Sequence, residues 1–165
     1  MIENRSYSLK ELKDLVNTLH LPIEVSLFKD ADFNSNNPKI LLIQSDVDEY
    51  TGHYVLVYEN NGIVYFFDPS ASKPLQIFKQ YHLDQNNQDI TPFYNYLSNK
   101  NIDYNNHNYQ SKNSKICGLM CIVRYLYNDL DTDKFYKYIK IIKKKYGLNN
   151  MDDTFIGILN TILGN

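Results

Sequence analysis

The sequence predicts an α+β fold in which a mixed β-sheet packs against a buried central helix. Three observations lead to this prediction. A capped amphipathic helix opens the chain, short apolar runs and a hairpin signal follow it, and helical patterns fill the C-terminal part. We find no internal repeat and no linker, so residues 1–165 are expected to form a single domain. A chain of this length buries enough surface to fold without disulfides.

The first helix is predicted over residues 9–19. Ser8 and Glu11 form an S-x-x-E capping box, which satisfies backbone N–H groups at a helix start. Pro22 ends the helical pattern. The apolar positions at helical spacing are Leu9, Leu12, Leu15, Val16 and Leu19.

Four short strands are expected next, because apolar, β-branched and aromatic residues gather in runs that turn-forming segments separate. Polar loops are expected over residues 29–38 and 45–52. The strands are predicted over residues 23–28, 39–44, 54–58 and 63–67.

A tight hairpin is predicted at Glu59-Asn60-Asn61-Gly62, because this segment carries the Asn-Gly dipeptide that favours tight β-turns. If Tyr58 pairs with Ile63, His53 stands opposite Asp68 at the open end of this hairpin. The imidazole could then donate its Nδ1–H to the carboxylate.

The second half of the chain is predicted to be mainly helical. Residues 74–81 fit either a strand or a helix, and residues 82–90 form a polar loop. Thr91 should cap one helix, Asp131-Thr132-Asp133 a second, and Asp152-Asp153 a third. The remaining elements are a strand over residues 101–109 and helices over residues 92–99, 117–129, 132–146 and the C-terminal 154–163.

Cys117 stands where a polar segment meets the apolar central helix. A thiol in the first turn of a helix lies near the positive end of the helix dipole, which favours the thiolate. Gln110, seven residues earlier, could fold back and donate an amide N–H beside the backbone N–H of Cys117. Together with His53 and Asp68, these residues supply a nucleophile, a base, its orienting acid and an oxyanion donor.

A purely structural interpretation of the same residues remains open. Most lone cysteines are buried in cores, and an aspartate before a proline usually forms a turn. Cys121, one turn after Cys117, is interpreted as buried packing. We expect no metal site, because no zinc spacing joins the candidate ligands Cys117, Cys121, His53, His82 and His107.

Three motifs resemble the adenovirus-type cysteine protease family (adenain), within the clan that includes the Ulp-type deSUMOylases. They are Gly52-His53-Tyr54-Val55-Leu56, Tyr65-Phe66-Phe67-Asp68-Pro69, and Gln110-x-x-Asn113-Ser114-x-x-Cys117-Gly118-Leu119-x-Cys121. Their order along the chain is also that of the clan. The similarity extends over roughly residues 8–129.

The resemblance implies an adenain/Ulp-like α+β cysteine peptidase core with further helices at the C-terminus. It assigns Cys117 as nucleophile, His53 as base, Asp68 as its orienter and Gln110 as oxyanion donor. Two departures are conservative: Tyr54 stands where the family often has Trp, and Asp68 where adenain has Glu. No further cysteine is present to tether an activating peptide.

The implied function is a cysteine endopeptidase that cuts viral capsid or core precursors after a small residue such as Gly during virion maturation. DNA viruses and virophages carry such enzymes. One alternative is a deconjugase of ubiquitin-like modifiers, and a second is a non-catalytic binding domain with the same fold. Both enzyme roles suit a cleft for Gly-Gly-type substrates, so the active-site residues do not separate them.

Partners and location follow from composition and from the same resemblance. A net charge of −2 argues against extensive nucleic-acid binding, although a weak DNA contact at Lys143-Lys144-Lys145 stays open. No cofactor is expected to be required, and activation by DNA or a peptide stays an alternative. With its two cysteines four residues apart and no apolar run of membrane length, the chain is expected to be a reduced, intracellular protein. The expected compartments are the host cytoplasm, the viral factory and the virion.

Overall fold

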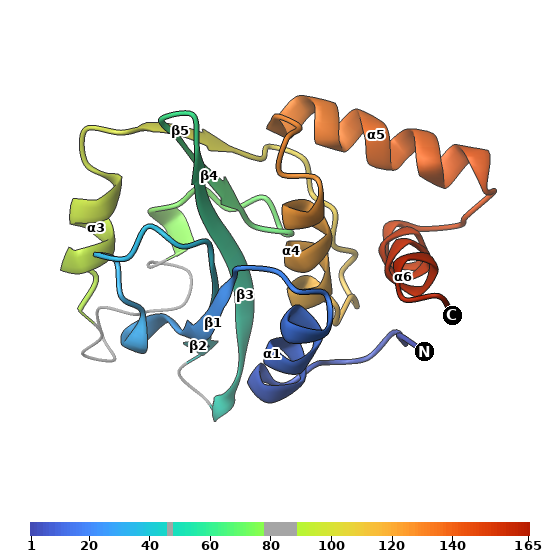
Figure 1. The fold of residues 1–165 in the computed structure, drawn as a ribbon, viewed down its shortest axis with the longest axis horizontal. Coiled ribbons are helices and arrows are strands. Elements are labelled where there is room, and N and C mark those ends of the chain that lie inside the picture. The colour runs from blue at the N-terminus through green and yellow to red at the C-terminus, as the bar shows by residue number, and fades with distance from the viewer. Residues whose placement is uncertain (46–47, 78–88) are drawn as a thin grey trace.

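A five-stranded mixed sheet forms the centre of the computed structural model, which describes residues 1–45, 48–77 and 89–165 (Figure 1). The strand order is β1-β2-β3-β4-β5. The two outer pairs are parallel and the two inner pairs antiparallel, so the sheet is mixed, as predicted. The strands are β1 (Glu24–Leu27), β2 (Lys39–Ser45), β3 (Asp48–Asn60), β4 (Ile63–Phe67) and β5 (Asn101–Tyr104).

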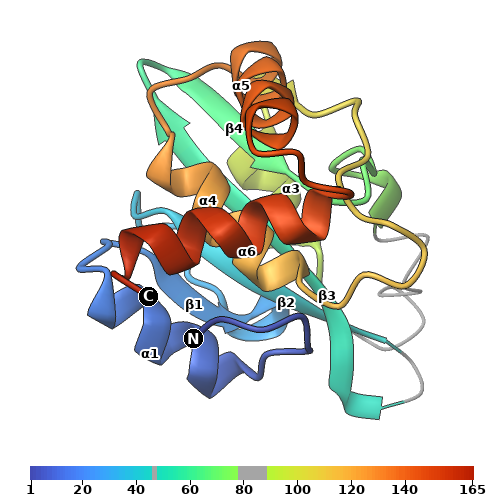
Figure 2. The same cartoon turned by 90° about the vertical axis from the view of Figure 1, so that its right-hand side faces the viewer.

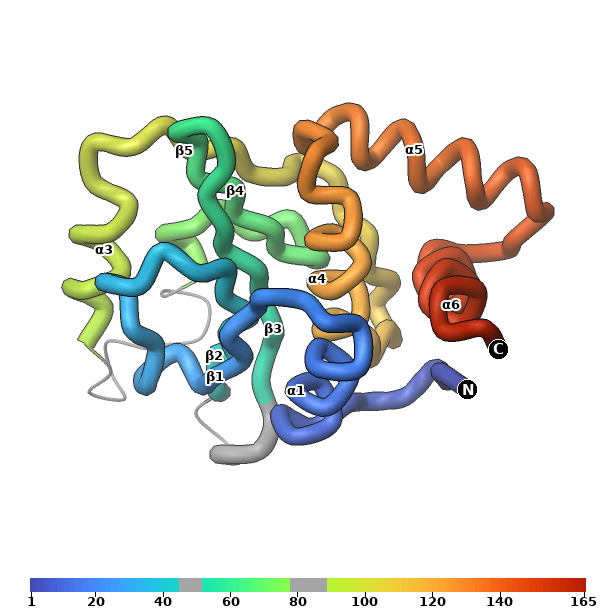
Figure 3. The backbone as a smooth tube through the Cα atoms, viewed as in Figure 1, coloured from blue at the N-terminus to red at the C-terminus, as the bar shows by residue number. Residues whose placement is uncertain are grey.

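Helices cover both faces of this sheet (Figures 1 and 3). On one face lie α1 (Leu9–Thr18), α4 (Cys117–Leu126), α5 (Thr132–Lys145) and α6 (Met151–Ile162). On the other face lie α3 (Thr91–Leu97) and the short 3-10 helix η1 (Phe28–Asp30). This arrangement is compatible with the predicted α+β class.

The side chains of β3 divide the core in two. Tyr54, Leu56 and Tyr58 point into the larger core beneath α1 and α4, whereas Val55 and Val57 point into the smaller core beneath α3. Because successive residues of a strand face opposite sides, an unbroken apolar run is what a strand covered on both faces requires.

The central helix is α4, and its first eight residues are all buried. Helix α6 packs across it on the side away from the sheet (Figure 2). The two ends of the chain meet there, since Asn160 of α6 accepts a hydrogen bond from the Ile2 N–H and donates one to the Ile2 carbonyl. The helix that begins at Cys117 is therefore enclosed by other elements.

Two of the predicted helix caps are confirmed. Ser8 Oγ accepts a hydrogen bond from the Glu11 N–H while the Glu11 carboxylate accepts one from the Ser8 N–H, so the capping box of α1 is complete. Asp131 caps α5 by accepting from the Lys134 N–H.

The other two predicted caps are wrong. Ile90, without a side-chain hydrogen bond, occupies the N-cap of α3, and Thr91 is already helical. Asn150 caps α6 by accepting a hydrogen bond from the Asp153 N–H. The predicted cap residues Asp152 and Asp153 lie instead in the first turn, where acidic side chains suit the helix dipole.

The hairpin register differs from the predicted one by two residues. Ile63 pairs with Asn60 rather than with Tyr58, because Asn61 and Gly62 alone form the turn. Both have positive φ angles, 51° and 77°, as this kind of two-residue turn requires. An even shift leaves every side chain on its predicted face, so His53 and Asp68 still lie on the same side of the sheet.

Several predicted boundaries also change. β3 begins at Asp48, so the loop predicted over residues 45–52 is wrong where the chain is described. β5 and α4 end earlier than predicted, at Tyr104 and Leu126. Residues 74–77 form a turn that leads into helical backbone, and the rest of the ambiguous 74–81 segment lies outside the described residues.

The contact between α1 and α4 generates a stability prediction at Gly118. A Cβ atom there would lie 2.4 Å from Leu12 Cδ1 and 3.2 Å from Tyr54 Cδ2. Leu12 is fully buried and cannot move aside freely. We expect Gly118→Ala to lower the free energy of unfolding by about 1–3 kcal/mol, as overpacking usually does.

Gly157 of α6 provides the matched control, because nothing lies within 4 Å of the position of its Cβ atom. Gly157→Ala should stabilise the protein by about 0.5–1 kcal/mol, the usual gain for alanine over glycine inside a helix. Urea unfolding of both variants checks the pair. Equal effects at the two glycines would contradict the close approach of α1 to α4.

Candidate active site

The four residues singled out in the sequence come from two elements and two connecting segments. His53 lies on β3, Asp68 directly follows β4, and Cys117 is the first residue of α4. Gln110 lies between β5 and α4. His53, Gln110 and Cys117 line one cleft of about 600 Å³. Asp68 is fully buried and contacts His53.

The imidazole of His53 links the acid to the thiol. Its Nε2 lies 2.5 Å from Oδ1 of Asp68, so the expected His–Asp contact is present. The ring is turned relative to the prediction, because Nε2 rather than Nδ1 meets the carboxylate. The ring also has a hydrogen bond to the Cys117 side chain.

These contacts determine the protonation of His53. Burial lowers the pKa of the imidazole, but hydrogen bonds to Asp68 and Cys117 outweigh that effect and raise the pKa to about 10. The ring is therefore charged at neutral pH. An imidazolium beside a cysteine favours the thiolate, which is the nucleophilic form.

The carboxylate of Asp68 is surrounded by donors from the turn that follows it. Oδ1 accepts a hydrogen bond from the Ser70 N–H at 2.7 Å, and Oδ2 accepts one from the Ser72 N–H at 3.3 Å. The Ala71 N–H donates to the Asp68 carbonyl, and Ala71 has a φ of 63°. Residues 68–72 thus curl around the carboxylate, and their donors offset part of the cost of burying it.

Asn105 holds the main chain of Asp68 and was missed in the sequence. Its Oδ1 accepts from the Asp68 N–H at 3.0 Å, and its Nδ2 donates to the Asp68 carbonyl at 2.6 Å and to the His107 carbonyl at 3.1 Å. β4 and β5 are parallel, so residues just past their ends meet at one edge of the sheet. The sequence predicted one strand over residues 101–109, so it did not show that β5 ends at Tyr104, directly before Asn105.

Gln110 is fixed by hydrogen bonds from both its main chain and its side chain. Its N–H donates to the Pro69 carbonyl and to Asn108 Oδ1. Its side-chain Nε2 donates to the Ser114 carbonyl at 3.1 Å, and its Oε1 accepts from Ser70 Oγ at 2.8 Å. The amide is therefore held in one orientation beside the cleft.

The start of α4 supplies a second set of donors in this cleft. Cys117 is the first helical residue, and Ile116 at the N-cap makes no side-chain capping bond. The first N–H groups of a helix have no carbonyl partner within it. The backbone N–H of Cys117 and the amide of Gln110 are thus the two donors that could bind a developing oxyanion.

The walls of the cleft come from α1, β2 and β3. Tyr54 provides an aromatic wall, and its hydroxyl donates to the Tyr7 carbonyl at 3.3 Å. Gly52, which directly precedes His53, has no room for a side chain, since its Cβ would lie 2.2 Å from the Ile43 carbonyl oxygen. This close approach of β2 to β3 sets the position of His53 on the strand.

Other predicted candidates lie outside this constellation. Cys121 is fully buried, its Sγ contacts the Tyr54 carbonyl, and burial raises the pKa of its thiol. His107 stacks on Tyr136. Lys143-Lys144-Lys145 forms the last turn of α5. His82 lies outside the described residues.

Neither a metal cluster nor a membrane span is found in the described part of the chain. Within residues 1–45, 48–77 and 89–165, no three His, Cys, Asp or Glu side chains gather as metal ligands would. None of the described helices is long and apolar enough to cross a membrane.

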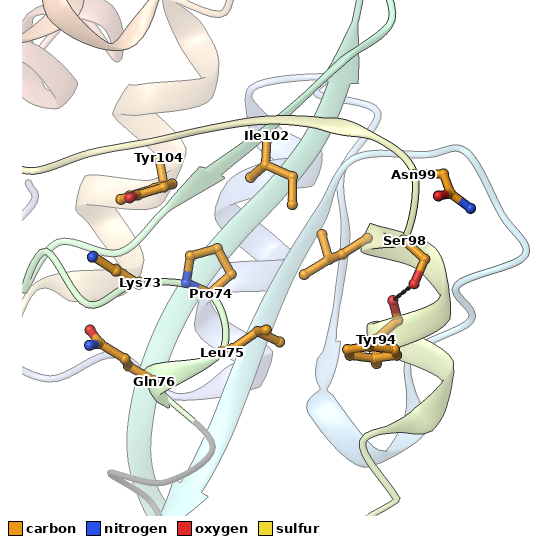
Figure 4. A pocket seen from close by; sticks show the side chains of 10 residues that line it. Lys73, Pro74, Leu75, Gln76, Tyr94, Ser98, Asn99, Ile102 and Tyr104 are labelled. Atoms are coloured by element: carbon orange, nitrogen blue, oxygen red, sulfur yellow. Dashed lines mark hydrogen bonds between the residues drawn. The ribbon is translucent and has the colours of Figure 1, made fainter.

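A second hollow of about 570 Å³ lies between residues 73–76, α3 and β5 (Figure 4). Its lining is mostly apolar and includes Leu75, Tyr94 and Ile102. None of the four predicted site residues lines it. The chemistry of the sequence motifs therefore belongs to the cleft at Cys117.

The charge of His53 generates a prediction for NMR titration. In the wild type, the imidazole should stay protonated through pH 8, because its pKa is raised to about 10. Asp68→Asn removes the anionic partner and should move the pKa of His53 down, toward the ordinary value of about 6.5. His53→Gln assigns the signal. Titration of wild-type His53 near pH 6.5 would show that the hydrogen bonds to Asp68 and Cys117 do not act as described.

Comparisons with known proteins leave the site to be judged on its own geometry. No protein-family model matches the chain, and no curated protein matches it either. We therefore infer the function from the positions and contacts of His53, Asp68, Gln110 and Cys117.

Proposed function

We propose that this chain is a cysteine endopeptidase of the adenain type. The observation that carries the proposal is the His53 ring, which is hydrogen-bonded to the buried Asp68 carboxylate and to the Cys117 thiol within one cleft. Thiol hydrolases need this arrangement, in which the nucleophile contacts the base and the base contacts the acid that orients it. A cysteine that only packs in a core needs no charged imidazole beside it, and burying that charge costs free energy.

In the proposed reaction the Cys117 thiolate attacks the carbonyl carbon of the scissile peptide bond. The carbonyl oxygen becomes negatively charged and accepts hydrogen bonds from the Cys117 N–H and the Gln110 side chain. The His53 imidazolium then gives its proton to the leaving amine, which departs and leaves an acyl-enzyme. The neutral imidazole next removes a proton from water, whose oxygen attacks the thioester carbonyl. The C–S bond then breaks, the product leaves as a carboxylic acid, and the Cys117 thiolate and His53 imidazolium are restored.

Asp68 keeps its charge throughout this cycle. Its carboxylate holds the imidazole in place and stabilises the imidazolium form, as the orienting acid of a catalytic triad does. Because the carboxylate is buried, its attraction to the imidazolium is little screened by water. Asn105 and the turn over residues 68–72 in turn hold the carboxylate.

The proposed substrates are viral capsid or core precursor proteins, cut after a small residue such as Gly. This part of the proposal rests on the resemblance of the motifs around His53, Asp68 and Cys117 to the adenovirus-type cysteine protease family. Incubation with candidate precursors and with ubiquitin-like conjugates, each with and without DNA, separates maturation protease from deconjugase. The proposal expects cleavage of the precursors, and cleavage of the conjugates alone would overturn it.

Cys117→Ala tests the nucleophile. Alanine is only slightly smaller than cysteine and favours the helix, so we expect the variant to remain folded. Without the thiol it should lose all hydrolysis. Circular dichroism and urea unfolding check the fold, and a cleavage assay checks activity. Cys121→Ala is the matched control and should keep hydrolysis. Hydrolysis by Cys117→Ala would reject the assignment.

Gln110→Ala tests the oxyanion donor. Loss of one such donor usually costs about two to three powers of ten in kcat. Alkylation of Cys117 by a small reagent forms no oxyanion, so its rate should stay close to that of the wild type. An unchanged kcat would remove Gln110 from the mechanism, while equal losses of hydrolysis and alkylation would point to a distorted cleft.

A further inference from the structure

We propose that Ser70 is a positioning residue that sets the orientation of the Gln110 amide and joins it to the acid behind His53. The inference rests on the proposed hydrolase function and adds a residue that neither the sequence motifs nor the resemblance assigned. Its basis is a set of hydrogen bonds that join residues 68–70 to residues 109–114.

Ser70 contacts both halves of the candidate site. Its backbone N–H donates to Oδ1 of Asp68 at 2.7 Å, the same oxygen that meets His53 Nε2. Its hydroxyl donates to Oε1 of Gln110 at 2.8 Å. One residue therefore touches the acid that orients the base and the amide that faces the oxyanion.

The carbonyl of Ser114 fixes which end of the amide is which. A carbonyl oxygen can only accept a hydrogen bond, so the group 3.1 Å from it must be the NH2 end of Gln110. The oxygen end then faces Ser70, whose hydroxyl must be the donor. The amide has two N–H bonds, and the one that Ser114 does not use is the donor that the reaction needs.

The main chain holds Ser70 and Gln110 together. The N–H groups of Tyr109 and Gln110 both donate to the Pro69 carbonyl, at 2.9 Å and 3.1 Å. Tyr109 is itself buried in the core. Ser70 thus lies at a fixed place relative to Gln110, and its hydroxyl needs little further ordering to donate.

Loss of the Ser70 hydroxyl would leave Oε1 of Gln110 without its donor. The amide would then be held by its Nε2–H bond to the Ser114 carbonyl alone. The terminal torsion of a glutamine side chain has broad preferences, so the amide could turn about that bond and move its other N–H away from the position that the oxyanion needs. Because the oxyanion exists only in the transition state and intermediate, kcat should fall while KM stays nearly constant.

Kinetics of single and double variants test this role. Ser70→Ala should lower kcat by about tenfold, the effect of one net hydrogen bond. Ser70→Thr keeps the hydroxyl and should restore most of kcat. In a Gln110→Ala background, Ser70→Ala should have little further effect, because Ser70 acts through that amide. The exposed Ser111, replaced by Ala, is the control and should keep wild-type kcat.

A second readout does not depend on turnover. The side-chain NH2 signals of Gln110 in a ¹⁵N–¹H spectrum should shift in Ser70→Ala, return in Ser70→Thr and stay unchanged in Ser111→Ala. Unchanged Gln110 signals in Ser70→Ala would overturn the inference, whatever the activity. So would equal losses of kcat from Ser70→Ala in the wild-type and Gln110→Ala backgrounds.

Failure of the proposed function looks different from failure of the Ser70 role. If the wild type cuts none of the precursors or conjugates, the hydrolase proposal fails while the Gln110 signals still report on Ser70. If the wild type is active and Ser70→Ala keeps full kcat, the Ser70 role fails and the hydrolase proposal stands.

Discussion

The carboxylate of Asp68 is fully buried, and its contact with His53 is the constraint around which the site is organised. A buried charge is tolerated only when an opposite charge and hydrogen-bond donors replace the water it has lost. His53 supplies the charge, and the turn after β4 supplies the donors. Asn105 bonds both the N–H and the carbonyl of the same residue. Several otherwise separate segments thus meet at one carboxylate.

The Cys117 thiol lies beside His53 and Asp68 because packing fixes the position of α4 along its length. Helices α1 and α6 and the sheet enclose α4, and Gly118 allows Leu12 of α1 to approach its first turn closely. Cys117 is consequently held at the edge of a packed core, only 8% exposed, with its side chain lining the cleft. Such rigid support suits chemistry that depends on distances of a few tenths of an ångström.

Local signals in the sequence predicted much of this arrangement. The capping box at Ser8, the Asn61-Gly62 turn and the apolar run after Cys117 each depend on neighbouring residues, and each is confirmed. The hairpin register was wrong by two residues because the turn proved to be as short as such turns can be. The even error preserved the face of each strand, and so the meeting of His53 with Asp68 survived it.

Contacts between segments far apart in the chain were the part that sequence could not supply. Asn105 and Ser70 act across 37 and 40 residues, on Asp68 and Gln110 respectively. Both are ordinary loop residues by type, and only the parallel pairing of β4 with β5 brings their segments together. The contact of His53 Nε2, rather than Nδ1, with Asp68 is likewise something that no spacing in the sequence encodes.

The most direct test of the central claim measures the reactivity of Cys117 without any substrate. Iodoacetamide alkylation at pH 6, followed by peptide mass mapping, reports the thiolate at Cys117, with the buried Cys121 as an internal reference. We expect rapid modification of Cys117 alone in the wild type and a rate slower by about tenfold or more in His53→Gln. Equal rates in the two proteins would contradict the claim that His53, held by Asp68, activates this cysteine.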